Sequence, residues 1–170
     1  PRLERLVQEN GDADLRISLL GQAGNAWLMA GEMERANAAL SAGLELAPDN
    51  LDLLIDRSLV LAAAKNYWET VDDLNRALDI DPTNSDALVF RASAYRYLDS
   101  LDLASDDVDR ALELKGSHVA AYLERGNIRR LQGDSAGARK DWLQAIKLAP
   151  TSPAAEAARR NLERMDIKLE

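Results

Sequence analysis

Arginine and aspartate recur together in this sequence, and their spacing indicates paired charges. Three arginines lie at equal intervals along the chain, and an aspartate follows each of them at the same separation. The pairs are Arg57 with Asp73, Arg91 with Asp107, and Arg125 with Asp141. At the equivalent earlier positions both residues are alanine, Ala23 and Ala39, so the two charges are present or absent together. A row of arginines displayed to an acidic ligand would not need its own aspartates, so we expect structural ion pairs.

Cysteine and histidine, which many catalytic and metal sites use, are scarce in this chain. The chain has no cysteine, and His118 is its only histidine, which leaves it without partners for a metal site or a catalytic triad. The carboxylate pairs Asp72-Asp73 and Asp106-Asp107 are sequence neighbours, so on a helix the two members point in different directions. We therefore expect no catalytic residue, no cofactor and no metal, and we expect His118 to be a linker or helix-start residue.

Composition excludes several classes of partner. Of 170 residues, 46% are apolar and 29% are charged, which suits a folded chain, and the formal charge is −8. Such a surface repels phosphate backbones, so no nucleic-acid partner is expected. No apolar run approaches the ~18 residues that a membrane helix needs, so no membrane insertion is expected. The sequence begins at Pro1, so we expect a processed or excised chain, either cytoplasmic or, after removal of a signal peptide, periplasmic.

A 34-residue repeat organises most of the chain. Pro48, Pro82 and Pro150 lie at intervals of one and two periods, and the skipped position is Gly116, another residue that stops helices. Four blocks follow without gaps, with extra residues at both ends. The division is 1–16, 17–50, 51–84, 85–118, 119–152 and 153–170.

Each block has the pattern of two amphipathic helices joined by a turn. Position 8 is always small, which allows helix backbones to approach closely, and position 24 is always large and apolar. Position 8 is Gly24, Ser58, Ala92 and Gly126, and position 24 is Leu40, Leu74, Val108 and Trp142. Gly, Asn, Asp and Ser near position 15 end one helix and begin the next. Apolar residues at helical spacing exclude strands.

These blocks resemble the tetratricopeptide repeat, whose unit is a helical hairpin with small residues at positions 8 and 20 and proline at 32. The resemblance covers 136 of 170 residues and departs at Gly116 and at Arg129, where an apolar residue is usual. It implies an all-α fold, an α-solenoid whose hairpins stack into a right-handed superhelix. The leading helices would line a concave groove.

The two ends are expected to complete the stack. Residues 153–165 predict a capping helix with one face for the last repeat and one for water. Residues 3–9 predict a short helix that breaks at Asn10-Gly11, the trailing helix of a degenerate or truncated repeat. Trp142 should be a core residue. Trp68 should pack in the core or between repeats, with a contact surface as the alternative.

The resemblance also assigns groove residues, an apolar stripe edged by acids. The candidates are Asn25, Met29, Asp52, Asp56, Leu59, Asp86, Val89, Phe90, Arg96, Tyr97, Glu124, Asn127 and Arg130. For three further stripe members, Ile55, Leu123 and Leu131, packing between leading helices is an equal alternative. The family's two-carboxylate clamp for acidic chaperone tails is not expected, because only Asn25 matches it, while Gly21, Asp56, Asp86 and Phe90 replace its other residues.

These features together predict a non-catalytic interaction scaffold. It would bind a neutral or basic, partly apolar protein segment in the groove. One alternative is a module that self-associates into a homo-oligomer through its N-terminal helix. Another is a regulatory domain of a larger protein.

Overall fold

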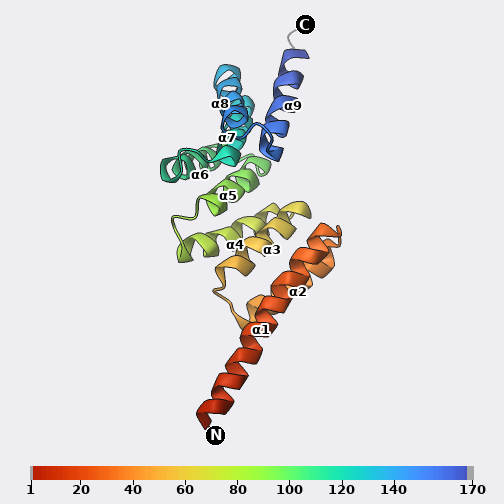
Figure 1. Ribbon diagram of the computed structural model, residues 1–170. Helices are drawn as coiled ribbons and strands as arrows, with labels where there is room; N and C mark the ends of the chain where they lie inside the picture. The colour runs from red at the N-terminus through yellow and green to blue at the C-terminus, as the bar shows by residue number, and fades with distance from the viewer. Residues whose placement is uncertain (1, 168–170) are drawn as a thin grey trace. The chain divides into compact units, whose positions relative to one another are not determined.

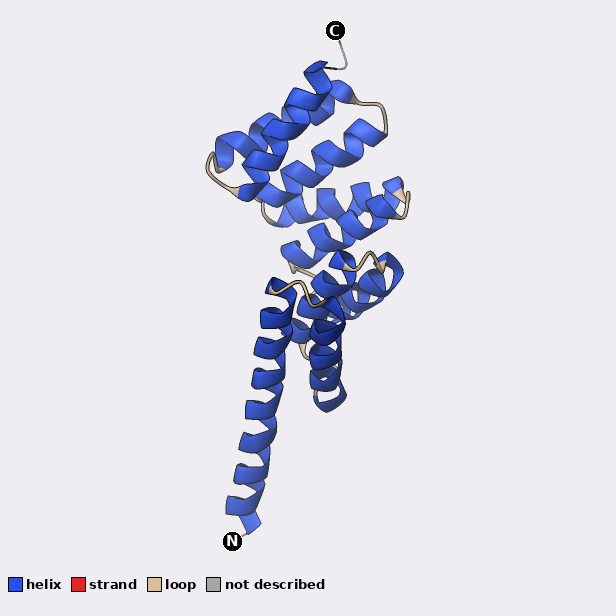
Figure 2. Cartoon of the chain, turned by 90° about the vertical axis from the view of Figure 1, so that its right-hand side faces the viewer, coloured by secondary structure: helices blue, strands red, loops and turns tan. Residues whose placement is uncertain are grey.

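The computed structural model describes the backbone of residues 2–167 and the side chains of residues 11–166. All regular structure in this part of the chain is helical (Figures 1 and 2). The helices are α1 (Arg2–Met29), α2 (Met33–Leu46), α3 (Leu51–Ala63), α4 (Tyr67–Ile80), α5 (Ser85–Tyr97), α6 (Leu101–Leu114), α7 (Val119–Leu131), α8 (Ser135–Leu148) and α9 (Pro153–Ile167).

Helix boundaries recur with the period of the sequence repeat. The leading helices α3, α5 and α7 begin at Leu51, Ser85 and Val119, which are the first residues of the predicted blocks. The trailing helices α2, α4, α6 and α8 also begin one period apart. The all-α fold, a solenoid of helix-turn-helix units, is therefore confirmed.

The same turn closes every hairpin. The residue at position 15 has a positive φ in all four hairpins, at Gly31 (78°), Lys65 (65°), Asp99 (59°) and Gly133 (87°). The following amide donates to the carbonyl five residues earlier, for example from Glu32 to Trp27 at 2.9 Å. This is the Schellman ending, which satisfies carbonyls that the helix leaves free.

The chain divides into two compact units, Pro1–Pro82 and Thr83–Glu170. In the N-terminal unit, α1 packs on α2 and α3, and α3 packs on α4, around Leu40, Leu53 and Leu54. In the C-terminal unit, α7 packs on α8 and α9 around Trp142, which is fully buried as predicted for a core residue.

Small residues at position 8 set how closely the two helices of a hairpin approach. A Cβ added at Gly24 would lie 2.4 Å from Cγ of Leu40 in α2. At Gly126 it would lie 2.5 Å from Nε1 of Trp142 in α8. The small residue at position 8 therefore makes room for the large side chain at position 24 of the same hairpin.

The predicted break at Asn10-Gly11 is wrong. Helix α1 runs without interruption from Arg2 to Met29, so no separate trailing helix precedes the first hairpin. Glycine in a helix interior is unfavourable by only about 1 kcal/mol relative to alanine, and unlike proline it keeps its amide hydrogen bond. The N-terminal part of α1 extends beyond its partner α2 (Figures 1 and 2).

The predicted capping helix corresponds to α9, and residues 168–170 lie outside the described residues. It packs on α7 and α8 and buries Ala155 and Ala158, while Arg159 and Glu163 on other faces are exposed. Ser152 begins the helix, because its hydroxyl accepts from the Ala155 amide at 3.1 Å.

The preferred interpretation of Trp68 is wrong. Its side chain is 67% exposed. It lies two residues before Thr70, which is buried, and residues i and i+2 of a helix point in different directions. Trp68 is therefore part of the surface.

Candidate functional site

Each predicted arginine–aspartate pair joins the two helices of one hairpin. Arg57 of α3 donates from Nε and Nη2 to the two carboxylate oxygens of Asp73 in α4, at 2.7 and 2.6 Å. The other two pairs repeat this two-point geometry at distances between 2.7 and 2.9 Å. All three aspartates are buried, and their arginines are about one-fifth exposed. Paired guanidinium and carboxylate planes of this kind fix helix orientation as well as charge.

The arginines also reach the preceding trailing helix. Nη1 of Arg57 donates to Ser41 at 3.1 Å, and Nη1 of Arg125 donates to Asp109 at 2.9 Å. Burial alone would lower the pKa of Arg125, but Asp141 and Asp109 outweigh it and raise the pKa. The arginines therefore make contacts of both kinds, with the aspartate of their own hairpin and with the trailing helix of the preceding hairpin.

Asp141 holds two arginines. Besides Arg125, Nη1 of Arg129 donates to Asp141 Oδ2 at 2.7 Å. Arg129 is the charged residue at position 11, where the repeat usually has an apolar one. Its partner explains this departure, because a guanidinium beside a buried carboxylate is satisfied.

His118 is the N-cap of α7, as predicted for a helix-start residue. Its side chain is buried, with Nε2 3.0 Å from Oδ1 of Asp86. Burial lowers the pKa of His118, and Lys115 adds to this, while Asp86 opposes it. No group of three or more potential metal ligands occurs among the described residues.

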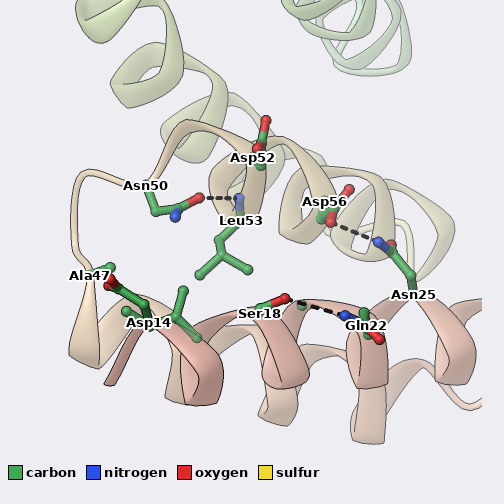
Figure 3. A pocket seen from close by; sticks show the side chains of 11 residues that line it. Asp14, Ser18, Gln22, Asn25, Ala47, Asn50, Asp52, Leu53 and Asp56 are labelled. Atoms are coloured by element: carbon green, nitrogen blue, oxygen red, sulfur yellow. Dashed lines mark hydrogen bonds between the residues drawn. The ribbon is translucent and has the colours of Figure 1, made fainter. Parts of the chain in front are cut away.

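A pocket opens between α1 and α3 in the N-terminal unit (Figure 3). It has a volume of about 520 Å³, and its wall combines carboxylates with amide, hydroxyl and apolar groups. The carboxylates are Asp14, Asp52 and Asp56, and we call this site the acidic pocket. Asn25 reaches from α1 and donates to Asp56 at 2.8 Å, as the dashed line in Figure 3 shows.

The three aspartates of the acidic pocket differ from those of the hairpin ion pairs in their partners. In the part of the chain that the structure describes, no lysine or arginine pairs with its three aspartates. Burial and the neighbouring Asp52 raise the pKa of Asp56, and the hydrogen bond from Asn25 only partly offsets this. A cationic or hydrogen-bond-donating group bound in the acidic pocket would stabilise the charged form of Asp56 against both burial and the repulsion from Asp52.

The fold separates the predicted groove residues. Asn25, Asp52 and Asp56 line the acidic pocket, and Ile55 packs against the nearby core. A second pocket, in the C-terminal unit, collects four others. They are Arg96, Tyr97, Asn127 and Arg130.

The remaining groove candidates are distributed over other surroundings. Met29 is 90% exposed and Leu131 is exposed, whereas Leu59 and Phe90 are half-buried. Asp86 is exposed beside His118. Leu123 packs on the core around Trp142 and also lines the second pocket.

Two candidates are wrong as ligand-facing residues. Val89 is buried, on the same side of α5 as Ala92, which has no exposed surface. Glu124 is buried as well, and Nε of Arg96 donates to its carboxylate at 2.5 Å. Glu124 therefore does not contribute an acidic rim, because its charge is already paired.

The two units differ sharply in charge. The N-terminal unit has 7 basic and 15 acidic residues, so it carries the whole formal charge of −8. The C-terminal unit has 14 of each. The formal charge of the whole chain conceals this division, which a count over successive blocks of the sequence shows.

Sequence reasoning also missed pocket residues beyond the four blocks and before them. Asp14 lies before the first block and lines the acidic pocket because α1 begins well before residue 17. Asn161 and Arg164 of α9 line the second pocket. Extending the 34-residue count into 153–170 places these two residues at positions 9 and 12, the positions of Asn127 and Arg130 one period earlier.

The hairpins, their Schellman turns and the stacked leading helices define a helical-repeat solenoid. Comparison with solved structures identifies the fold as that of tetratricopeptide-repeat proteins. No protein-family profile matches the sequence, and no curated protein sequence matches it.

Three solved structures illustrate the likeness. The thermophilic repeat protein TTC0263 of Thermus thermophilus superposes with a TM-score of 0.80 at 16% identity, covering 88% of this chain and 82% of that one. MamA from Desulfovibrio magneticus RS-1, residues 41 to the end, gives 0.72 at 19% identity, covering 81% and 77%. The second repeat domain of human RPAP3, solved with the HSP70 peptide SGPTIEEVD, gives 0.66 at 24% identity, covering 69% and 98%. At these identities the likeness shows the fold.

None of the helices in the described part of the chain is both long and apolar enough to cross a membrane.

Proposed function

We propose that this chain is a non-catalytic protein-interaction module whose acidic pocket binds a neutral or basic, partly apolar segment of a protein partner. The observation that carries the proposal is the set of three aspartates around a pocket of about 520 Å³, which no lysine or arginine in the described part of the chain neutralises. Ile17 and Leu53 supply apolar surface in the same wall. A short segment combining lysine or arginine with an aliphatic side chain complements both features.

The fold supports this class of function. Solved proteins with the same fold include one with a bound peptide. The proposal keeps the division into four repeats at 17–50, 51–84, 85–118 and 119–152, with 1–16 before them and the capping segment 153–170 after them.

The test is peptide binding by fluorescence anisotropy. We expect the labelled peptide AKLLRKALKL to bind, and its neutral analogue AQLLQQALQL to bind more weakly. The Asp52→Asn/Asp56→Asn variant should weaken the basic peptide at least fivefold at low salt, and less as salt screens the charges. The matched control is Asp72→Asn/Asp79→Asn, which removes the same charge outside the acidic pocket. Equal loss in both variants would contradict the proposal.

The two-carboxylate clamp is not proposed as the binding mode. Of its positions this chain keeps Asn25, and that side chain is already engaged with Asp56. Binding of SGPTIEEVD that is lost in Asn25→Ala would contradict this exclusion.

Self-association is the second candidate, because α1 extends beyond the first hairpin with apolar residues exposed. Leu15 and Leu19, one helical turn apart, are 59% and 55% exposed. Light scattering during size exclusion distinguishes the candidates. A dimer that dissociates in Leu15→Ser/Leu19→Ser supports assembly through α1, and a monomer in both cases contradicts it.

A further inference from the structure

The second pocket lies in the C-terminal unit and is walled by arginine and asparagine. It has a volume of about 360 Å³ and is formed by the leading helices α5 and α7 and the capping helix α9. We call it the arginine pocket. Its charged and amide groups are Arg96, Arg130, Arg160, Arg164, Asn127 and Asn161.

Three of the four arginines form a series. Arg96, Arg130 and Arg164 are separated by one repeat period each, so they occupy the same position, 12, on the alternate helices α5, α7 and α9. Arg160 lies one turn before Arg164 on α9 and therefore on the same face. In the N-terminal unit the same position carries Leu28 and Ala62, neither of which is charged. The series is therefore a property of the C-terminal unit and not of the repeat.

The four arginines of the pocket differ in their carboxylate partners. Burial alone would lower the pKa of Arg96, but the charge of Glu124 and the hydrogen bonds with Glu124 and Tyr97 outweigh it and raise the pKa. Arg160 approaches Glu156 at 3.8 Å, with both side chains more than half exposed. Among the described residues, no carboxylate forms an ion pair with Arg130 or Arg164. The pocket thus holds uncompensated positive charge in a unit with equal numbers of acids and bases.

The wall of the pocket is held in place by hydrogen bonds and packing. The side-chain oxygen of Asn127 accepts hydrogen bonds from Trp142 Nε1 at 3.3 Å and from the side-chain amide of Asn161 at 2.9 Å. The side-chain nitrogen of Asn127 donates to the carboxylate of Glu124 at 3.2 Å. Since Trp142 is fully buried, this network anchors α7 and α9 to the core. The wall is thus built before any ligand arrives, which reduces the entropy lost on binding.

Aromatic and aliphatic groups complete the wall. Tyr97 stacks under the Arg96 guanidinium, 4.2 Å from the ring centroid, and Leu123 of α7 also lines the pocket. A ligand therefore needs an anionic group for the arginines and a carbon skeleton for the apolar part.

We propose that the arginine pocket binds an acidic peptide segment of a protein partner, with aspartate or glutamate carboxylates, or a C-terminal carboxylate, on Arg130 and Arg164. Guanidinium groups match carboxylates in two-point geometry. A polyphosphate backbone is disfavoured, because the chain as a whole carries −8 and the pocket is small. The ligand is opposite in charge to that of the acidic pocket, so the two proposals stand or fall separately.

The experiment measures binding of the labelled acidic peptide ALEELDDLED, with its amidated neutral analogue ALQQLNNLQN as reference. We expect the acidic peptide to bind at least tenfold more tightly than the analogue at low salt. The Arg130→Glu/Arg164→Glu variant should lose at least tenfold in affinity. The Asp52→Asn/Asp56→Asn variant should bind the acidic peptide within twofold of the unchanged chain.

The matched control is Arg159→Glu/Arg110→Glu, which reverses the same charge in the same unit outside the arginine pocket and should bind within twofold of the unchanged chain. Thermal unfolding by circular dichroism checks that all variants fold, and Arg130→Gln/Arg164→Gln gives a milder version if charge reversal unfolds the unit. Equal affinity for the two peptides, or equal loss in the control, would overturn the proposal. Tighter binding of a single-stranded dodecanucleotide than of the peptide would also overturn it.

Discussion

The acidic pocket and the arginine pocket are built by the same repeat, yet their charges are opposite. Each is walled by leading helices, and each has an asparagine at position 9, Asn25 in one and Asn127 in the other. The acidic pocket adds aspartates from α1 and α3, whereas the arginine pocket adds arginines at position 12. The difference teaches that positions buried in the hairpin fix the fold, while positions facing the pockets vary and set the ligand.

The largest contrast concerns the buried carboxylates that join the helices of each hairpin. Asp141→Ala in the C-terminal unit removes the carboxylate partner of Arg129 and leaves Arg125 with Asp109 alone, so it should destabilise the protein by about 3–5 kcal/mol. Asp73→Ala in the N-terminal unit removes the carboxylate of one arginine, Arg57, which keeps its hydrogen bond to Ser41, and should have a smaller effect. Urea unfolding followed by circular dichroism measures both. An unchanged midpoint for Asp141→Ala would show that the pair contributes nothing to stability.

The turns give a smaller effect that is the same in both units. Each unit has one glycine and one larger residue at position 15 with positive φ, Gly31 and Lys65 in the first, Asp99 and Gly133 in the second. Lys65→Gly and Asp99→Gly should each stabilise by about 0.5–1 kcal/mol, because glycine adopts this conformation without a Cβ clash. Gly31→Ala and Gly133→Ala should destabilise. Thermal midpoints check the sign, and a loss in Lys65→Gly would contradict the assignment.

His118 gives the stability of the C-terminal unit a pH dependence, and the N-terminal unit contains no histidine. Burial holds the pKa of His118 below its ordinary value of 6.5, so the unfolded chain takes up a proton first as pH falls. The stability due to neutral His118 is complete above about pH 6.5 and decreases as pH falls through that range. His118→Asn introduces the N-cap residue used at Asn50 and Asn84 and should show a smaller decrease. Thermal midpoints at pH 7.5 and 5.5 test this, and an equal decrease in both proteins would exclude the histidine as the cause.

The smallest expected effect belongs to the acidic pocket itself. Burial raises the pKa of Asp56, so the folded state favours the protonated carboxyl more than the unfolded state does. The resulting stabilisation is present at low pH and is lost as the pH rises through the raised pKa. Asp56→Asn should therefore stabilise the N-terminal unit at pH 7 and lose that advantage at low pH. Asp79→Asn, on the exposed face of α4, is the control. Equal urea midpoints for Asp56→Asn and Asp79→Asn at pH 7 would show that the charge of Asp56 does not destabilise the folded state.

Much of the fold follows from residues that are close in the sequence. Gly24 with Leu40, and Gly126 with Trp142, recur at the same spacing, so the hairpins and their close approach were predictable. The arginine–aspartate pairs were also visible, because the two charges disappear together at Ala23 and Ala39. The continuity of α1 was not predictable from Asn10-Gly11, because glycine disfavours a helix interior by only about 1 kcal/mol and keeps its amide hydrogen bond, so it is found both within helices and at their ends.

The sequence by itself determined the period, the helical hairpins, the capping helix and the residues that join each pair of helices. These depend on spacing along one or two helices, which a linear pattern records directly. Only the tertiary structure decided which pocket each side chain enters, since Asn25 meets Asp56 and Arg96 meets Glu124 across helices that are distant in the sequence. It also decided which charges remain unpaired, because pairing depends on which helices become neighbours.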